Sequence, residues 1–384
     1  MFLKANTKPS IPQTALFHQH ENASQDIFEF IYNNSEKVRY AFDDHELGPE
    51  DIVFIKELIE EPTGRDEKTW KYKGRGEEKA FLYEIVSNHR NGMDVDKWDY
   101  IARDCHQLGI KNSFDHSRFM KFARVIVGED GRTQICLRDK ELINLYSMFA
   151  SRYLLHKMAY QHKVICGLEI MVGQAIVKAQ HDLRFDNYTI PDIIKTKYWK
   201  AYSLMTDNLL YKIRDTTGGS ENLKAAKKIV EKIFNRDFYR CVCESRPFKP
   251  EVWIGRERGG NKESKTEKET RIKEEILTET TSAEFTKEDY FVQIVNLDFG
   301  MKDKNPLEKM CVYSKKDPKV ARKIRQDEMS QVLAQRTFTE LMLRVYISNN
   351  DKEDVIKKAY DKWEKKNLTE PQETATTSSR SENV

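Results

Sequence analysis

Apolar residues recur every three or four positions through most of the chain up to about residue 245, a spacing that places them on one face of an α-helix. Ser24 is a candidate N-cap, and Pro49 occupies the first turn of a helix. Gly and Pro residues predict a loop over 62–76. The predicted helices cover 24–33, 49–59, 78–90, 95–107, 115–125, 138–178, 193–214 and 221–235.

The pattern changes after Pro247. Short apolar runs predict strands at 251–254, 290–295 and 310–313, and the charged stretch 255–284 predicts an exposed loop. Helical spacing returns over 329–347 and 351–366, with Trp363 on the apolar side of the second helix. The fold class is therefore mainly α, with a small mixed α/β lobe at the C-terminal end.

This change of pattern also predicts the domain organisation. We expect an irregular lead-in over 1–19, a helical domain over 20–245 and an α/β lobe over 246–366. The Thr-, Ser- and Glu-rich segment 367–384 is typical of a disordered tail.

Composition narrows the class of protein without identifying a function. Of the 384 residues, 39% are hydrophobic and 33% charged, which is typical of a charge-rich globular protein, and the net charge of +3 is too small to indicate nucleic-acid binding by itself. The six cysteines show no zinc spacing and favour free thiols in a reducing intracellular compartment, nuclear or cytoplasmic. The sequence contains no apolar run long enough for a membrane span, so no membrane partner is expected.

Two polar stripes carry the candidate chemistry. Asp96, Tyr100 and Asp104 lie at i, i+4 and i+8 and share one helix face, and Arg152, His156 and Tyr160 repeat that spacing. Such stripes can supply a carboxylate for a metal, cations for phosphates and a ring for a sugar. They can equally be two solvated helix faces, and spacing alone leaves both interpretations open.

The residues around these stripes resemble a known family. Four segments are similar in sequence to the SAM- and HD-domain dNTP triphosphohydrolases: Phe81–Asn88, Arg90–Gly92, Asp94–Tyr100 and Ala102–Cys105. The resemblance continues in Phe114-Asp115, Arg118–Arg124, Arg138–Glu141, Asn144–Tyr146, Arg152 and Ala159–Lys163. It covers about residues 20–365 and is most specific over 81–163.

The resemblance implies a fold, a reaction and a set of site residues. The helical part would be the C-terminal part of an HD-type domain and the α/β lobe would be regulatory. The family splits a dNTP and water into a deoxynucleoside and triphosphate. By position in the motifs, Lys97, Tyr100 and Arg152 would hold phosphates, Asp104 the sugar 3′-hydroxyl, Tyr160 the sugar ring and Gln161 the base region, while His20 and His156 would be catalytic histidines.

The family also implies a divalent metal (Fe, Mn, Zn or Mg) held by a His…His-Asp…Asp set, in which Asp96 resembles the last carboxylate. No His-Asp pair precedes Asp96, and the nearby His18 and His20 make only a short pair. We therefore expect an N-terminally truncated family member, without the SAM domain and the first part of the HD domain. Such a chain should bind metal weakly and turn over dNTPs slowly or not at all.

A second set of residues resembles the family's allosteric nucleotide site, at which dNTPs activate by assembling a tetramer. Its members share a polar or cationic side chain suited to phosphate, and they are Arg118, Arg138, Lys140, Asn144, His162, Lys163, Arg236, Arg240 and Lys315. Expected partners are thus dNTPs as substrate and activator, and a homo-oligomer or a hetero-oligomer with a full-length homologue.

Two other functions stay open from the sequence. One is a non-enzymatic, nucleotide-binding or regulatory paralogue of the triphosphohydrolases. The other is a single-stranded nucleic-acid binder, because a basic surface that binds nucleotides can also accept a phosphate backbone.

Overall fold

The computed structural model describes residues 20–62, 69–249, 263–280, 285–330 and 337–368. The predicted lead-in, His18, the strand at 251–254 and the tail beyond 368 lie outside these residues. The chain forms two compact units: Met1–Phe238 with Leu297–Thr339, and Tyr239–Asn296 with Glu340–Val384. This division differs from the predicted boundary at 245/246, because the chain returns to the first unit over 297–339 before the second is complete.

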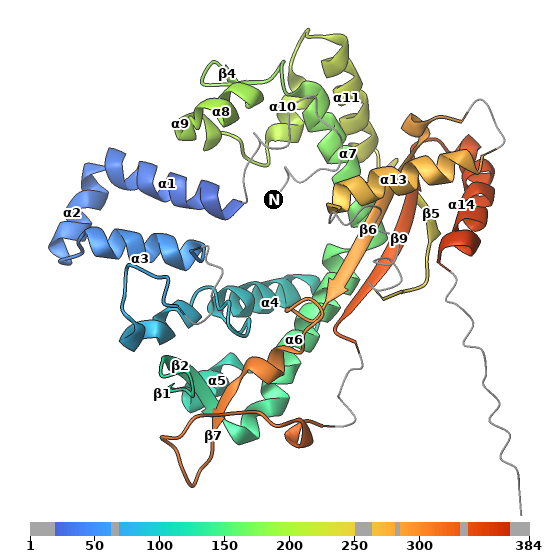
Figure 1. The fold of residues 1–384 in the computed structure, drawn as a ribbon. Coiled ribbons are helices and arrows are strands. Elements are labelled where there is room, and N and C mark those ends of the chain that lie inside the picture. Colours follow the sequence, from blue (N-terminus) through green and yellow to red (C-terminus); the bar gives the residue numbers. More distant parts are fainter. Residues whose placement is uncertain (1–19, 63–68, 250–262, 281–284, 331–336, 369–384) are drawn as a thin grey trace, which may run out of the picture. The chain divides into compact units, whose positions relative to one another are not determined.

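Three helices open the first unit (Figure 1): α1 (His20–Asn34), α2 (Glu36–Asp44) and α3 (Pro49–Ile59), with α1 packed against the other two. The prediction for 49–59 is confirmed, including Pro49 in the first turn. The predicted helix 24–33 is confirmed but begins earlier, at His20. The sequence pattern missed α2, a short helix that buries none of its side chains.

The next segment contains one confirmed helix and one wrong prediction. The helix predicted over 78–90 is only a short 3₁₀-helix, η3 (Glu77–Glu84), with a non-helical residue at Lys79. Helix α4 (Val95–Leu108) confirms the prediction for 95–107. The Asp94 carboxylate caps its N-terminus, and Gly109 ends it in the left-handed conformation, with φ of 68°.

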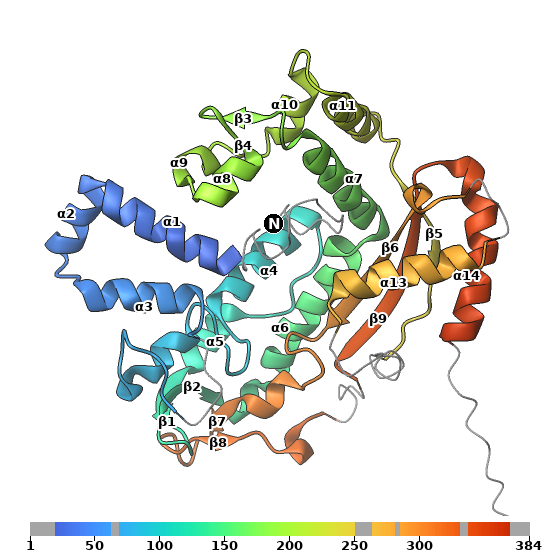
Figure 2. The same ribbon diagram turned by 45° about the horizontal axis from the view of Figure 1, so that its top comes forward.

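A small sheet follows helix α5 (His116–Phe122) and was not predicted (Figure 2). Strands β1 (Arg124–Val127) and β2 (Thr133–Arg138) form a hairpin, with Arg124 opposite Cys136. The predicted β7 (Cys311–Tyr313) pairs in parallel with β2, and β8 (Arg322–Lys323) completes the order β1-β2-β7-β8. The predicted helix 115–125 therefore ends at Phe122, where the chain enters a strand.

The long helix predicted over 138–178 is three elements. After the 3₁₀ turn η4 (Asp139–Glu141), helix α6 (Leu142–Leu155) passes into a π-helical turn, η5 (His156–Tyr160), and then into α7 (Lys163–Ala179). The π-turn is marked by the Gln161 N–H donating to the carbonyl of His156, five residues back, at 2.8 Å. Helical periodicity alone does not reveal such a break.

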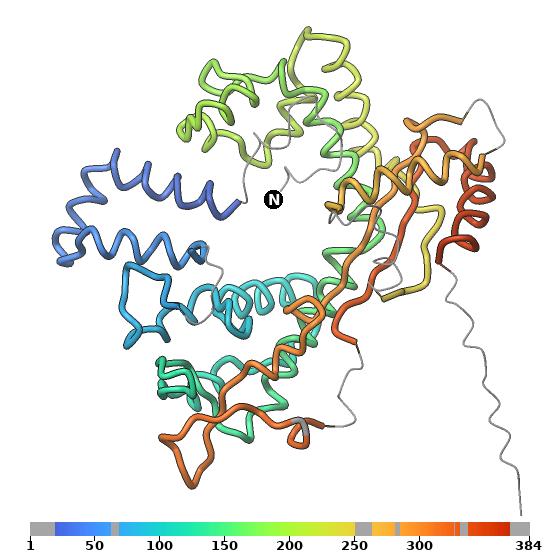
Figure 3. Tube along the Cα trace, viewed as in Figure 1, coloured from blue at the N-terminus to red at the C-terminus, as the bar shows by residue number. Residues whose placement is uncertain are grey.

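The rest of the helical part is built from shorter elements. The predicted helix 193–214 is divided into α8 (Ile190–Thr196), α9 (Trp199–Tyr202) and α10 (Leu209–Asp215), after a two-stranded hairpin of β3 (Arg184–Phe185) and β4 (Tyr188–Thr189). Helix α11 (Glu221–Phe234) confirms the prediction for 221–235 and packs along α7 (Figure 3). Two 3₁₀ turns, η7 (Pro306–Lys309) and η8 (Gln326–Glu328), lie in the segment that returns to the first unit.

In the part of the second unit that the structure describes, a three-stranded sheet packs with two helices. Strands β5 (Arg240–Glu244), β9 (Thr339–Ile347) and β6 (Tyr290–Asp298) pair in the order β5-β9-β6, and α13 (Lys265–Thr278) and α14 (Glu353–Asn367) share their core. The 3₁₀ turns η6 (Lys287–Asp289) and η9 (Asn350–Lys352) precede β6 and α14. The predictions of β6 and α14 are confirmed, with Trp363 3% exposed.

Two predictions for this unit are wrong. The expected loop 255–284 contains α13, whose Ser264 and Glu267 form a capping box and whose Ile272 and Ile276 are buried. The expected helix 329–347 contains strand β9. Its last six residues are all buried, so the alternation that marks a half-exposed strand is hidden.

Each unit has its own hydrophobic core. In the first unit α4, α6 and the small sheet meet around Ile101, Leu145, Phe149 and Val312. The fold is thus mainly α with small mixed sheets, as predicted. None of the helices within the described ranges is long and apolar enough to cross a membrane.

Candidate functional site

The packing of α4 on α6 brings the two polar stripes together. On α4, Ile101 and Cys105 point into the core, with exposures of 0% and 2%. Tyr100 and Asp104 precede them in the chain and lie half-buried at the edge of that buried face. The Tyr160 hydroxyl donates a hydrogen bond to the Asp104 carboxylate. The rings of Tyr100 and Tyr160 meet edge to face, with centroids 6.3 Å apart. These contacts show that the two stripes face each other.

The π-turn sets the direction of the second stripe. Because the turn is wider than an α-helical one, Tyr160 is displaced from the position that continuous α6 geometry would give it. The His156 and Tyr160 rings are edge to face, with centroids 4.9 Å apart. Burial and the hydrogen bond to Asp104 raise the pKa of the Tyr160 hydroxyl, so Tyr160 acts as a donor at neutral pH. π-turns are frequent at functional sites.

Arg152 lies at the same site and is held by a residue that the sequence did not single out. Its Nη1 donates to the backbone carbonyl of Asp298 at 2.9 Å and lies 3.2 Å from the Asp298 Oδ1. Burial raises the pKa of the Tyr100 hydroxyl, and the charge of Arg152 opposes part of this rise. A strand-ending Asp-Phe-Gly is a common turn pattern, so the sequence gives no strong signal for Asp298.

Burial and the neighbouring charge of Arg152 lower the pKa of His156 to about 4, and Asp298 acts in the opposite direction. His156 is therefore neutral at pH 7 in the free chain.

Lys97 has a buried partner that the sequence also missed. Its Nζ lies 2.7 Å from the Oδ2 of Asp94, whose side chain is almost fully buried. The same carboxylate accepts from the backbone N–H of Lys97 and of Asn88, both at 3.0 Å. Asp94 could have been found as the N-cap of the helix, and the structure shows that it also orients Lys97.

The other predicted site residues are Asp96, Gln161 and His20, and the charge of Asp96 acts on the pKa of Tyr100. Asp96 is exposed in the first turn of α4, and Gln161 follows the π-turn. His20 is 72% exposed at the start of α1, where its Nε2 lies 3.0 Å from the Glu21 carboxylate. The catalytic roles predicted for His20 and His156 stay predictions.

Part of the predicted allosteric set gathers around Phe122. Arg118 and Arg138 both lie over its ring, with guanidinium carbons 5.2 and 6.0 Å from the centroid. Arg118 is held by the buried Glu141 through Nε and Nη2, each at 2.6 Å. Lys140 and Lys315 are exposed at the ends of the paired strands β2 and β7. We call Arg118, Arg138, Lys140 and Lys315 the Phe122 cluster.

The other members of that set have different surroundings. Asn144 is used in a local contact, in which its side chain bonds both backbone groups of Asp115 at 2.9 Å. His162 caps α7 and is followed by the exposed Lys163. Arg236 has a left-handed backbone, with φ of 59°. Arg240 belongs to the second unit and pairs with Glu353 at 3.0 Å.

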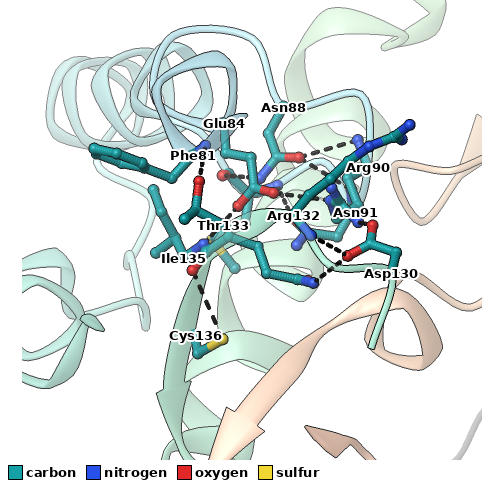
Figure 4. Close-up of polar contacts among 12 residues, drawn as sticks. Phe81, Glu84, Asn88, Arg90, Asn91, Asp130, Arg132, Thr133, Ile135 and Cys136 are labelled. Carbon is teal, nitrogen blue, oxygen red and sulfur yellow. Dashed lines mark hydrogen bonds and ion pairs between the residues drawn. The ribbon is translucent and has the colours of Figure 1, made fainter. Parts of the chain in front are cut away.

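A buried ion pair fixes the segment that leads into α4 (Figure 4). The Glu84 carboxylate accepts from the backbone N–H of Ile135 at 2.8 Å and lies 2.8 Å from the Nε of Arg90. Arg90 also pairs with Asp130 at 2.9 Å. Glu84 thereby joins η3 to strand β2 and holds the loop that ends at Asp94.

Most of the chain is similar in sequence to known proteins. No family model matches the chain. The deoxynucleoside triphosphate triphosphohydrolase SAMHD1 of Homo sapiens is 39% identical over 365 residues, which covers 92% of this chain and 56% of that protein. The protein of the same name from Xenopus laevis is 36% identical over 379 residues, covering 92% of this chain and 57% of its own length. Over most of its length the chain is therefore similar in sequence to these triphosphohydrolases.

A more distant relative agrees with the fold. A putative HD domain-containing protein of Acanthamoeba polyphaga mimivirus is 29% identical over 213 residues, or 52% of this chain and 41% of that protein. The helical part of the first unit is accordingly an HD-type domain, and the second unit is its small α/β lobe. The chain spans little more than half the length of the triphosphohydrolases that it matches.

An HD-type triphosphohydrolase implies a divalent metal, so the donor set matters. Among the described ranges, no three His, Cys, Asp or Glu side chains lie close enough together to hold an ion. Asp96 offers one exposed carboxylate, whereas a divalent cation needs several ligands. The described residues by themselves therefore do not fit a divalent metal.

Proposed function

We propose that the facing residues of α4 and the π-turn form a pocket that binds a deoxynucleoside triphosphate for hydrolysis. In this reaction water adds to the α-phosphorus, the bond from that phosphorus to the sugar 5′ oxygen breaks, and the products are a deoxynucleoside and triphosphate. The observation that supports it is the hydrogen bond between Asp104 and Tyr160 close to Tyr100 and Arg152, in a chain similar in sequence to triphosphohydrolases.

The sugar is recognised by the Asp104–Tyr160 pair. The Asp104 carboxylate accepts a hydrogen bond from the 3′-hydroxyl, since a carboxylate is a strong acceptor for a ligand hydroxyl. The Tyr160 ring packs beneath the sugar and leaves no room for a 2′-hydroxyl. This ring is fixed in place by its bond to Asp104 and its contacts with Tyr100 and His156.

The phosphates are held by Arg152, Lys97 and Tyr100. The two cations are partly buried, with side-chain exposures of 16% and 20%, so their charges are less screened than those on the surface. Each is oriented by a carboxylate, Asp298 or Asp94, and retains further N–H donors for a phosphate.

His156 supplies a proton during bond cleavage. It is neutral in the free chain, and the negative charge of a bound triphosphate would raise its pKa and favour the protonated form. The protonated imidazole then donates to the departing 5′ oxygen. His20 would assist from α1, as the family resemblance implies.

The chain by itself is proposed to turn over slowly, because Asp96 is the single metal ligand that the family resemblance assigns among its described residues. Binding of dNTPs does not need the metal, since Lys97 and Arg152 attract phosphate directly. The alternative is a non-enzymatic regulator that binds nucleotides. It is supported by the lack, among the described residues, of a group of side chains that could hold a metal ion.

The test is triphosphate release from dGTP by the purified chain, with Mn²⁺ or Mg²⁺ supplied. We expect dGTP binding with little or no turnover. Metal-dependent turnover that Asp96→Ala abolishes would show that the metal site is complete and would contradict the proposed impairment. Absence of dGTP binding would contradict the pocket itself.

The Phe122 cluster is proposed as part of the regulatory site. Its four cations converge near one aromatic ring and two strand ends, an arrangement suited to a triphosphate of an activating dNTP. Occupation of such a site would favour assembly into a tetramer, or into a mixed oligomer with a full-length homologue.

A further inference from the structure

The turn Asp298-Phe299-Gly300 contacts the predicted phosphate-binding arginine through Asp298. Nη1 of Arg152 donates to the Asp298 carbonyl at 2.9 Å and lies 3.2 Å from Oδ1 of the same residue. Both N–H bonds of that nitrogen are therefore directed at one residue. An arginine has five N–H donors, so three remain for other partners.

The turn is itself fixed. Oδ1 of Asp298 accepts from the Gly300 N–H at 2.8 Å, which closes the turn, and Phe299 is 2% exposed with its ring 5.9 Å from that of Phe149. Phe299 also donates its N–H to the Phe338 carbonyl at 2.9 Å. The turn thus holds its shape independently of Arg152.

Gly300 allows the turn to approach α6 this closely. Its φ is 105°, in a region that favours glycine, and a Cβ there would lie 3.0 Å from Cδ1 of Phe149 and 3.9 Å from Cδ of Arg152. A side chain at residue 300 would strain the backbone and press on the ring below it. Glycine at position 300 therefore allows the turn to pack against α6, the helix that carries Arg152.

This arrangement fixes the direction of the guanidinium beside the Tyr100 hydroxyl. Within the described residues, Nε of Arg152 is buried without a hydrogen-bond partner, and the charge of Arg152 acts on the Tyr100 hydroxyl. An oriented cation with unused donors beside a tyrosine hydroxyl is pre-organised for an anion.

We propose that the Asp298-Phe299-Gly300 turn is a positioning device that fixes the Arg152 guanidinium and thereby sets the affinity of the pocket for triphosphate. The proposal rests on the proposed function, because it assigns Arg152 to the phosphates. Asp298 acts through Arg152 and does not contact the ligand.

The first measurement concerns Arg152 alone and needs no ligand. In protein labelled with ¹⁵N-arginine, the side-chain signal of Arg152 is assigned by its loss in Arg152→Lys. Restricted rotation of the guanidinium is expected in the wild type and free rotation in Asp298→Ala. Unchanged rotation in Asp298→Ala would overturn the proposal.

The second measurement is binding of inorganic tripolyphosphate and of dGTP by calorimetry. Asp298→Ala should weaken both by about tenfold, the order expected for loss of a bond to a charged group. Asp298→Asn, whose Oδ1 can still accept from Gly300 and Arg152, should stay within about threefold of wild type. Asp303→Ala, an exposed carboxylate of the same loop, is the matched control and should bind as wild type.

The third measurement separates positioning from a general structural role. In an Arg152→Ala background, Asp298→Ala should change the tripolyphosphate affinity by less than about twofold, since the two residues act together. A loss of the same size in both backgrounds would overturn the proposal. If the wild type bound neither probe while Asp298→Ala released Arg152, the turn would still be the device that fixes Arg152, and the proposed function would fall.

Discussion

Asp104 gives the sharpest prediction at the scale of single residues. If its carboxylate accepts the 3′-hydroxyl, Asp104→Ala should lower the affinity for dGTP by about tenfold, as for a lost hydrogen bond to a charged group. The affinity for 2′,3′-dideoxy-GTP, which lacks that hydroxyl, should change by less than about twofold. Calorimetry with both nucleotides measures the difference.

Asp99→Ala is the control for this substitution. Asp99 lies on the same helix with its side chain 70% exposed, so its loss changes the net charge equally without touching the pocket. An equal loss of affinity for both nucleotides in Asp104→Ala would assign Asp104 to packing and contradict its role in sugar recognition.

His156 predicts a pH dependence of stability. Its pKa in the folded chain is about 4, below the ordinary 6.5, so the unfolded chain binds this proton first as the pH falls. The stabilisation that depends on a neutral His156 is fully present above pH 6.5 and is lost as the pH falls from 6.5 to 4. Denaturant unfolding over this range should show a smaller loss of unfolding free energy in His156→Gln than in wild type.

An exposed histidine provides the comparison. His106 lies on α4, and His106→Gln should leave the pH dependence as it is in the wild type. Equal slopes for wild type and His156→Gln would show that His156 is not kept neutral by burial.

The sequence predicted the site residues unevenly, and the difference has a physical cause. The grouping of Tyr100 with Asp104, and of His156 with Tyr160, could be predicted because residues four apart share one helix face. Asp94 and Asp298 could not be predicted as partners of Lys97 and Arg152. Those contacts depend on how a helix start and a distant turn pack, and no local spacing encodes that.

At the scale of elements, Glu84 is predicted to hold η3 against strand β2. Its carboxylate is 5% exposed and pairs with Arg90 and with the Ile135 N–H. Glu84→Ala leaves the Ile135 N–H without its acceptor and removes one of the two carboxylates that pair with Arg90, so it should lower the unfolding free energy by about 2 kcal/mol. Urea unfolding measures this loss.

The matched control is Glu77→Ala at the other end of η3. Glu77 is 53% exposed and lies 3.4 Å from Arg132, and a surface pair of this kind contributes less than about 1 kcal/mol. Similar losses for the two variants would contradict the assignment of Glu84 as the link between these elements.

The elements themselves were predicted where one face alone is buried. Helices α4 and α11 have a single apolar stripe with buried residues and were found nearly to the residue. Strand β9 was mistaken for a helix because both of its faces are buried. The π-turn was missed because it changes the hydrogen bonding without changing the apolar spacing.

For the whole molecule, the Phe122 cluster predicts nucleotide-dependent assembly. Adding dGTP should raise the mass of the chain in sedimentation experiments, and Lys315→Ala should weaken this response, because it removes one exposed cation from the cluster.

Lys319→Ala is the control, since it removes an exposed cation from the loop between β7 and β8 outside the cluster. Assembly unaffected by Lys315→Ala, or reduced equally by both variants, would mean that Lys315 does not bind the nucleotide.

The central claim is that the pocket between α4 and the π-turn recognises a deoxynucleoside triphosphate. Its most direct test is the affinity of the chain for dGTP and for GTP, measured by calorimetry without added metal. With the Tyr160 ring beneath the sugar, dGTP should bind at least about tenfold more tightly than GTP, a difference of about 1.4 kcal/mol, and Tyr160→Ala should remove most of that preference. Equal affinities for dGTP and GTP in the wild-type chain would contradict the account.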